Sequence, residues 1–326
     1  MSWLEPVAEA FGLGRVDAVE QMVGMTNRLW RVEAGGSTYV VKEMIHVVDD
    51  ATLADRRPAA AFERAAWVAG LVHLPEPIVA SDGEVLVLAP GSRGRRLGVR
   101  VHRWADGDAT PRPSPPSTCR LAGETLARVQ AFGATWAWPS EHTYRDIEPN
   151  RRTVPATIAA LAERGLFDRD TAGRVHDAVE RALVLVDAGE ALPGAWTTTH
   201  YDLKPANTLW HDGRLTVLDW DECRVCHPWL EAVATAVIWA GSRDRPIDRD
   251  AFAAYLDGYG ATEPVTPPAF AKLVGNFVGW TGYQGRRALG EYPDDLPIER
   301  DDALVEARAA GEELVALLDQ LPSLCD

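Results

Sequence analysis

Long apolar runs are missing from this chain of 326 residues, and so is an excess of basic residues. No segment approaches the roughly eighteen consecutive apolar residues of a membrane-spanning helix. No basic stretch followed by an apolar core stands at the N-terminus, so we expect no signal peptide. Basic residues number 33 against 48 acidic ones, a net charge of −15, which argues against nucleic acid or an anionic membrane as a main partner. We therefore expect a cytoplasmic protein, as a monomer or homodimer.

Cysteine is also scarce, with four residues in the chain. Two of them lie in Cys223-Arg224-Val225-Cys226-His227, which matches the motif of covalent haem attachment. The missing export signal argues against haem, and the missing second cysteine pair argues against a zinc site. We interpret the pattern as a chance match, with a redox-sensitive pair as the alternative.

The most informative stretch runs from His200 to Asp221 and reads H-Y-D-L-K-P-A-N-T-L-W-H-D-G-R-L-T-V-L-D-W-D. Its Asp-Gly turn lies between two short apolar runs, which predicts a β-hairpin. A hairpin of this length brings the preceding loop and the following residues to one end of the sheet, so Asp202, Asn207 and Asp219 should converge. A carboxylate beside an amide–carboxylate pair suits proton acceptance next to Mg²⁺, which prefers oxygen ligands.

This stretch resembles the catalytic and metal loops of the protein-kinase superfamily, H-x-D-L-x-x-x-N followed by a metal-binding aspartate. Asp-Trp-Asp stands where protein kinases have Asp-Phe-Gly, and no A-P-E segment follows. The pattern is therefore similar to that of the aminoglycoside phosphotransferase and choline kinase branch, which acts on small molecules. The resemblance implies that Asp202 orients a hydroxyl and accepts its proton. Asn207 and Asp219 would hold Mg²⁺, with Asp221 as a further metal or supporting ligand.

The resemblance also implies supporting roles around this loop. His200 would brace the loop rather than act as a base, and Lys204 is placed to approach the transferred phosphate. Glu231 replaces the aspartate that the family commonly has after the metal loop, and it could keep the hydrogen bonds to the catalytic loop. Gln130 replaces a histidine that small-molecule kinases usually have.

The first hundred residues alternate apolar strands and turns, which favours a small sheet. We expect strands at 16–23, 29–32, 38–42, 85–89 and 99–104, helices at 3–12 and 59–71, and a charged mobile loop at 49–57. Lys42 ends the third strand, where kinases place a lysine that binds the α- and β-phosphates. The turn that contains Gly24, Thr26 and Asn27 is a small-residue loop that can lie over phosphates.

Lys42 needs an anionic partner, and the resemblance points to Glu63 on the helix after the third strand. Three other acids are rivals for this pairing: Glu43, Asp49 and Asp50. The resemblance also places the hinge at 102–105, where the backbone, including that of Arg103 and Trp104, would hydrogen-bond the purine edge.

The rest of the chain favours a mostly helical unit. We expect helices at 117–132, 153–164, 168–187, 228–241, 249–260, 267–290 and 301–321, after a Pro-rich loop at 110–117. The fold class is therefore α+β, with the two-lobed architecture of protein kinases. A nucleotide-binding N-lobe would cover 1–104, and a catalytic and acceptor-binding C-lobe would cover 105–326.

The acceptor site is expected along the C-terminal helices, which wall it in the family. The candidate acceptor residues, which mix rings with acids, are Trp280, Tyr283, Asp294, Asp295 and Glu299. Carboxylates attract ammonium groups, and aromatic faces add cation–π contacts. Arg286 and Arg287 complicate this view, because they could neutralise the acids or bind an anionic acceptor.

Together these patterns predict a small-molecule kinase that transfers the γ-phosphate of ATP (or GTP), with Mg²⁺, to a hydroxyl group. We expect a cationic acceptor of the aminoglycoside-antibiotic type, so that phosphorylation would confer resistance. An amino alcohol, an amino sugar or homoserine is the alternative acceptor. A pseudokinase-like binding module and a protein kinase are two further classes. The intact Lys42, Asp202, Asn207 and Asp219 argue against the pseudokinase.

Overall fold

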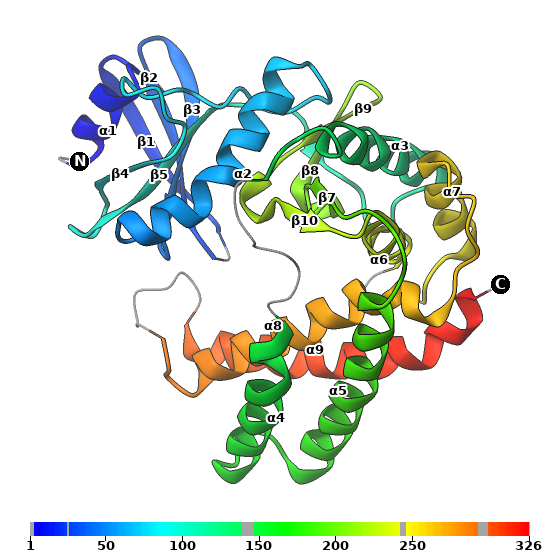
Figure 1. Ribbon diagram of the computed structural model, residues 1–326. Helices are drawn as coiled ribbons and strands as arrows, with labels where there is room; N and C mark the ends of the chain where they lie inside the picture. Colours follow the sequence, from blue (N-terminus) through cyan, green and yellow to red (C-terminus); the bar gives the residue numbers. More distant parts are fainter. Residues whose placement is uncertain (1–2, 25, 139–146, 242–245, 293–298, 326) are drawn as a thin grey trace.

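The computed structural model describes residues 3–24, 26–138, 147–241, 246–292 and 299–325. Figure 1 shows a smaller lobe built around a β-sheet beside a larger lobe that is mostly helical. The predicted two-lobed α+β fold is therefore confirmed. The division at residues 104 and 105 stays a prediction. Within the described ranges, no helix is both long and apolar enough to cross a membrane.

The small lobe contains one antiparallel five-stranded sheet with the strand order β1-β2-β3-β5-β4. The strands are β1 (Val16–Met22), β2 (Arg28–Ala34), β3 (Ser37–Met44), β4 (Val87–Pro90) and β5 (Arg96–Arg103). Side chains alternate between the two faces of a strand. Val41 and Val101 accordingly belong to a buried apolar cluster with Leu4 and Val7 of α1 (Leu4–Ala10). Lys42, one residue on from Val41, points to the opposite face.

Helix α2 (Asp50–Val68) lies between the sheet and the helical lobe (Figure 1). The mobile loop predicted at 49–57 is wrong, because this segment forms the first turns of the helix. Its start is fixed by a capping box, in which the Asp49 carboxylate accepts the Thr52 N–H at 2.8 Å and Thr52 Oγ1 accepts the Asp49 N–H at 3.1 Å. These bonds satisfy backbone donors that the first helical turn leaves open. Pro58 lies inside the helix without ending it.

The large lobe carries the remaining long helices and two small sheets. The helices are α3 (Pro116–Gly133), α4 (Ile147–Glu163), α5 (Arg169–Glu190), α6 (Pro228–Ala240), α7 (Arg249–Tyr259), α8 (Ala271–Ala288) and α9 (Arg300–Gln320). One sheet consists of β6 (Asp108–Ala109), β8 (Thr208–His211) and β9 (Arg214–Val217), in this order. In the other, β10 (Arg224–Cys226) pairs with β7 (Thr197–Thr199). β6 (Asp108–Ala109), β7 and β10 were not expected, because strands of two or three residues leave no alternating pattern.

The predicted hairpin is confirmed as β8 (Thr208–His211) and β9 (Arg214–Val217), which pair antiparallel. Its turn residues Asp212 and Gly213 have φ values of 48° and 76°, and Asp-Gly tolerates this left-handed backbone.

Strand β7, which precedes the catalytic stretch, is held by a close contact with α3. A Cβ on Gly133 of α3 would lie 1.7 Å from the Thr198 oxygen of β7, so only glycine allows this close approach.

Candidate active site

The loop after β7 brings three of the predicted residues together. Asp202 Oδ2 lies 2.8 Å from Lys204 Nζ and accepts a hydrogen bond of 2.8 Å from Asn207 Nδ2. The same amide nitrogen donates to the main-chain oxygen of Asp202 at 2.9 Å. Both contacts require the NH₂ group on this side, so Asn207 Oδ1 remains as the atom that can bind a cation.

His200 lies behind this loop and is fully buried. Its Nδ1 accepts the Asp202 N–H at 3.3 Å, and its Nε2 lies 3.0 Å from the Leu218 oxygen. A neutral imidazole with its proton on Nε2 satisfies both bonds. Burial keeps the pKa of His200 below its ordinary value, although Asp202 acts in the opposite direction. The ring therefore connects the loop to the end of the hairpin in its uncharged form.

The residue between His200 and Asp202 is held from two sides. Tyr201 has a left-handed backbone with φ of 67°. Its N–H donates to Glu231 Oε1 at 2.7 Å, and its carbonyl accepts from Lys272 Nζ at 2.8 Å. Glu231 Oε2 also accepts from Gln130 Nε2 at 3.0 Å. Glu231 therefore connects α6 to the catalytic loop. Its side chain is longer than that of the family's aspartate, and Gln130 donates a hydrogen bond to its second oxygen.

Lys42 reaches across from the sheet to the two acids after the hairpin. Its Nζ lies 2.6 Å from Asp219 Oδ1 and 2.5 Å from Asp221 Oδ2. Burial by itself would lower the pKa of Lys42, but the two carboxylates outweigh burial and raise it. The lysine is therefore a permanent cation at the junction of the two lobes.

The predicted ion pair between Lys42 and Glu63 is not what the structure shows. Glu63 instead forms an ion pair with Arg100, and His102 Nε2 lies 3.2 Å from its carboxylate. Arg100 NH1 also lies 2.6 Å from Asp221 Oδ1. Arg100 is the direct partner of Lys42 in the β3–β5 register, so the two cations share the acids on one face of the sheet.

The rival partners of Lys42 lie elsewhere. Glu43 points to the other face, where it accepts from Trp30 Nε1 at 3.0 Å and from Ser92 Oγ at 2.7 Å. Asp49 caps α2, and Asp50 is exposed in the first turn of that helix.

The three predicted metal ligands differ in how available they are. Asp219 is 44% exposed, and Lys42 takes one of its oxygens. Asp221 is 7% exposed, and its two oxygens pair with Arg100 and Lys42. Asn207 Oδ1 and the second oxygen of Asp219 are hard donors that suit Mg²⁺. Asp221, whose two oxygens are both in ion pairs, is the least available of the three and stays a predicted metal or supporting ligand. Over the described ranges, no group of three or more His, Cys, Asp or Glu side chains forms a metal cluster.

The predicted phosphate loop lies between β1 and β2 and reaches toward these acids. Asn27 Nδ2 donates to Asp221 Oδ2 at 3.3 Å. A Cβ on Gly24 would lie 2.2 Å from the Asn27 oxygen, so the turn requires glycine there. Thr26 is half-buried beside them.

The predicted hinge has two of its backbone donors engaged within the protein, and its contact with a purine stays a prediction. The Arg103 N–H donates to the Glu76 oxygen at 2.9 Å, and the Trp104 N–H donates to the Thr38 oxygen at 2.9 Å. Both N–H groups are therefore engaged within the protein, so a purine edge would have to meet the carbonyl oxygens of these two residues. The sequence could not show this, because backbone partners do not depend on side-chain identity.

The predicted acceptor residues are only partly described. Trp280 and Tyr283 lie on α8 with ring centroids 5.6 Å apart, and Tyr283 Oη lies 3.3 Å from Nε2 of His46 in the small lobe. Asp294 and Asp295 lie outside the described residues. Glu299 is exposed and precedes α9.

Two arginines occupy the aromatic faces in this region. The guanidinium of Arg287 lies 5.7 Å from the Tyr283 ring centroid, and that of Arg286 lies 5.3 Å from the Tyr292 ring centroid. Arg287 therefore already lies against Tyr283, one of the two rings that were expected to meet a cationic acceptor, whereas Tyr292 was not among the predicted residues.

Sequence reasoning missed Arg100, Lys272 and the backbone of Tyr201. One signal was available, because the chain has only three lysines among 33 basic residues. All three lie in this site: Lys42 against the acids, Lys204 on Asp202, and Lys272 beneath Tyr201. The positions of the few lysines in the sequence therefore indicate which segments form the site.

The cysteine pattern stands apart from this chemistry. Cys223 and Cys226 are buried free thiols, and burial raises the pKa of both. His227 Nε2 lies 3.2 Å from the Pro193 oxygen. A raised thiol pKa lowers the thiolate fraction on which reactivity depends.

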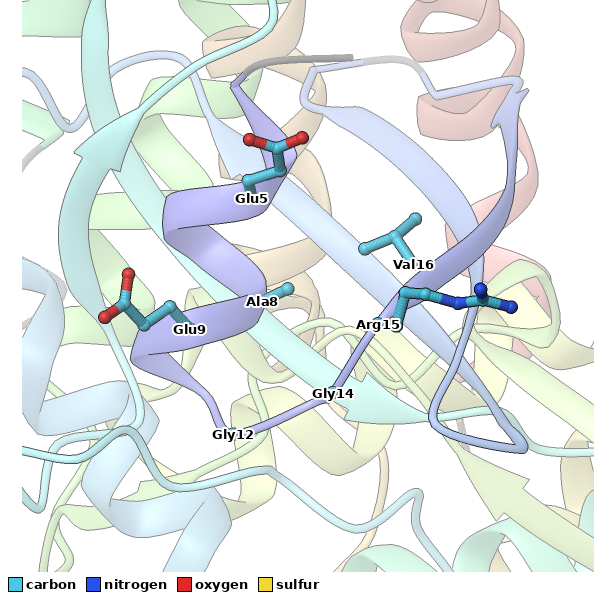
Figure 2. Close-up of a pocket in the computed structure, with 7 residues that line it drawn as sticks. All are labelled: Glu5, Ala8, Glu9, Gly12, Gly14, Arg15 and Val16. Carbon is cyan, nitrogen blue, oxygen red and sulfur yellow. The ribbon is translucent and has the colours of Figure 1, made fainter.

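A surface hollow lies at the other end of the small lobe (Figure 2). It is lined by Glu5, Ala8, Glu9, Gly12, Gly14, Arg15 and Val16. None of the predicted site residues takes part in it, so it is separate from the active site.

Comparison with known proteins identifies the fold and family. The amicoumacin kinase hAmiN, solved with AMP-PNP, Ca²⁺ and Ami, has a TM-score of 0.66 at 14% identity, with 95% of this chain and 91% of that chain covered. The microcompartment-associated aminopropanol kinase has a TM-score of 0.65 at 16% identity, with 97% of each chain covered. Spectinomycin phosphotransferase APH(9)-Ia, solved with ADP and spectinomycin, has a TM-score of 0.63 at 10% identity, with 93% and 94% covered.

No curated protein sequence matches the chain. The model of the phosphotransferase enzyme family, APH, matches residues 22–265. This match covers more than half of the chain and includes strands β2 to β5 of the sheet, the catalytic loop and the hairpin. The chain therefore belongs to the APH phosphotransferase enzyme family and is a kinase-type enzyme.

Proposed function

We propose that this enzyme transfers the γ-phosphoryl group of ATP or GTP to a hydroxyl of a small amine-bearing molecule. The observation that supports this most is the fixed carboxylate of Asp202, held by Lys204 and Asn207 within one loop. On the neighbouring side, Lys42 and the exposed Asp219 offer a cation and an oxygen ligand. This combination suits the positioning of a nucleophile beside a phosphate chain.

In the proposed reaction, the acceptor oxygen forms a bond to the γ-phosphorus as the bond to the β–γ bridging oxygen breaks. Asp202 accepts a hydrogen bond from the hydroxyl and takes its proton. The nucleoside diphosphate leaves with the electron pair of the broken bond. Lys42 binds phosphate oxygens, and Lys204 approaches the transferred group. Mg²⁺, held by Asn207 Oδ1 and Asp219, would neutralise charge on the phosphates.

The acceptor we favour is an aminoglycoside-type antibiotic, whose O-phosphorylation would confer resistance. The net charge of −15 favours a cationic molecule. Two of the similar structures contain an antibiotic with a nucleotide. The similarity to an aminopropanol kinase supports an amino alcohol as the alternative.

A second acceptor class is favoured by a specific observation. Arg287 lies against Tyr283 of the predicted acceptor wall, and Arg286 lies against the nearby Tyr292. A molecule with both an amine and a carboxylate, such as homoserine, could use these guanidinium groups. This candidate differs from an aminoglycoside in carrying an anionic group.

The test is nucleotide consumption with a panel of amino sugars, amino alcohols, aminoglycosides and homoserine, with product detection by mass. The proposal expects a gain of one phosphoryl group on an amine-bearing member, with release of the nucleoside diphosphate. Phosphorylation of homoserine alone would select the second class. No phosphorylated product from any member, at enzyme concentrations that bind nucleotide, would contradict the proposal.

A further inference from the structure

Arg100 belongs to a buried ion cluster, and the proposed reaction gives this residue no role of its own. The cluster consists of Lys42, Arg100, Glu63 and Asp221, which are at most 8% exposed. Two cations face two anions, so the cluster is electrically balanced. We propose that Arg100 is a positioning residue, which binds one oxygen of Asp221 and so prevents this carboxylate from pairing with Lys42 alone, leaving the lysine available for nucleotide phosphates. This inference rests on the proposed function.

The sheet register creates the need for such a residue. Lys42 and Arg100 are direct partners on neighbouring antiparallel strands, and like charges at such positions repel each other. Asp221 lies between them, with Oδ1 2.6 Å from Arg100 NH1 and Oδ2 2.5 Å from Lys42 Nζ. The carboxylate is therefore shared and not given wholly to either cation.

Arg100 also connects three separate parts of the fold. Its guanidinium pairs with Glu63 of α2 and with Asp221 after the hairpin, while its backbone belongs to β5. The cluster thus fixes the relative positions of α2, the sheet and the segment after the hairpin that carries Asp221. Arg100 takes the position beside Glu63 that the sequence had suggested for Lys42.

The consequence for Lys42 follows from charge. Without Arg100, Asp221 would pair with Lys42 alone, and Glu63 would be buried with no cation beside it. Buried anions without partners are costly, so both acids would draw on the single remaining cation. Lys42 would then be less available to a phosphate. With Arg100 present, its exchangeable partner is the more exposed Asp219.

Three single variants test this role. Arg100→Met removes the guanidinium and keeps the apolar volume, Arg100→Lys keeps one positive charge, and Arg96→Met is the control, because Arg96 is exposed on the same strand. Affinity for MgADP is measured by calorimetry, and nucleotide and acceptor KM values are measured separately. For Arg100→Met we expect a nucleotide Kd and KM raised about tenfold or more, the scale of one charged hydrogen bond. Acceptor KM should stay within about twofold.

The conservative and control variants separate positioning from folding. Arg100→Lys should recover part of the nucleotide affinity, and Arg96→Met should match the parent protein. If Arg100→Met does not fold, the double variant Arg100→Met/Glu63→Gln restores the charge balance of the cluster. That double variant should fold, should bind MgADP more weakly than the parent, and should keep its acceptor KM.

Clear outcomes overturn the inference. Unchanged MgADP affinity in a folded Arg100→Met or double variant would remove Arg100 from the role. An equal rise in nucleotide and acceptor KM would show that the residue only supports the fold. A failure of the proposed function would be seen in the parent protein, which would then bind no MgADP or phosphorylate no acceptor.

Discussion

The side-chain nitrogen of Asn207 lies 2.8 Å from Asp202 Oδ2 and 2.9 Å from the main-chain oxygen of the same aspartate. These two bonds fix the direction of the amide and of the carboxylate together. Loss of either side chain would therefore disturb both the proposed base and the proposed metal donor, whereas Asp202→Asn keeps a side-chain oxygen and the main-chain oxygen as acceptors for Asn207. The predictions below separate these roles.

Replacement of Asp219 by asparagine tests the proposed Mg²⁺ ligand. Asparagine tolerates the left-handed backbone of this position, where φ is 59°, so the fold should persist. Removing the charge should shift the Mg²⁺ dependence of turnover to much higher metal concentration, which a metal titration of the rate measures. An unchanged metal dependence would remove Asp219 as a ligand.

Replacement of Glu231 by alanine tests the bond between α6 and the catalytic loop. The Tyr201 N–H would lose its acceptor in a buried site, and Gln130 Nε2 would keep only its bond of 3.2 Å to the Pro228 oxygen. An unsatisfied buried group costs about 1–3 kcal/mol. Urea unfolding measures the loss, with Glu190→Ala on an exposed position of α5 as the control. Equal stability of the two variants would show that Glu231 is not a structural tie.

Replacement of Gly133 by alanine tests the close approach of α3 to β7. The new Cβ would overlap the Thr198 oxygen, and forced repacking costs about 1–3 kcal/mol. Activity should fall as well, because β7 leads into His200. Gly173→Ala is the matched control, since nothing lies within 4 Å of its Cβ position, and helix propensity should stabilise it by up to about 1 kcal/mol. A harmless Gly133→Ala would contradict the packing described here.

The pH dependence of stability should depend on His102. Burial, with Arg100 and Lys42 nearby, lowers its pKa to about 3. In the unfolded chain His102 takes up a proton below about pH 6.5, whereas in the folded protein it stays neutral down to about pH 3. The free energy of unfolding should therefore decrease as the pH falls from about 6.5 to about 3, by up to about 1.4 kcal/mol per pH unit.

His102→Gln should therefore flatten the decrease in unfolding free energy between about pH 7 and about pH 5. His211→Gln, at an exposed hairpin position, should leave the decrease unchanged. If the unfolding free energy of His102→Gln decreased as much as that of the parent protein, another group would be the cause of the acid sensitivity.

The sequence predicted the elements whose chemistry is local. The hairpin was predicted because Asp-Gly at 212–213 fits its turn. The catalytic loop was predicted because His200, Asp202 and Asn207 have the spacing of a known kinase motif. The capping box at Asp49 was also readable, but the charges around it suggested a loop.

The sequence could not predict which cation pairs with which acid. Lys42 and Arg100 are far apart in the chain, and their register becomes visible only in the sheet. The hinge donors at 103 and 104 are engaged by backbone oxygens from distant segments. Such pairings depend on how strands align, and no local pattern encodes them.

The most direct test of the account compares Asp202→Asn with the parent protein in phosphoryl transfer to the best acceptor of the panel. Asparagine keeps the shape of the side chain but cannot accept the proton. General-base catalysis typically contributes about 10²–10⁴-fold in rate.

The control is Asp212→Asn, in the exposed hairpin turn, where asparagine suits the backbone. MgADP affinity is measured for each variant, to show that the nucleotide site is intact. The account predicts that Asp202→Asn binds nucleotide like the parent and loses about 10²–10⁴-fold in transfer rate, while Asp212→Asn retains it. Transfer by Asp202→Asn at nearly the parent rate would contradict the central claim.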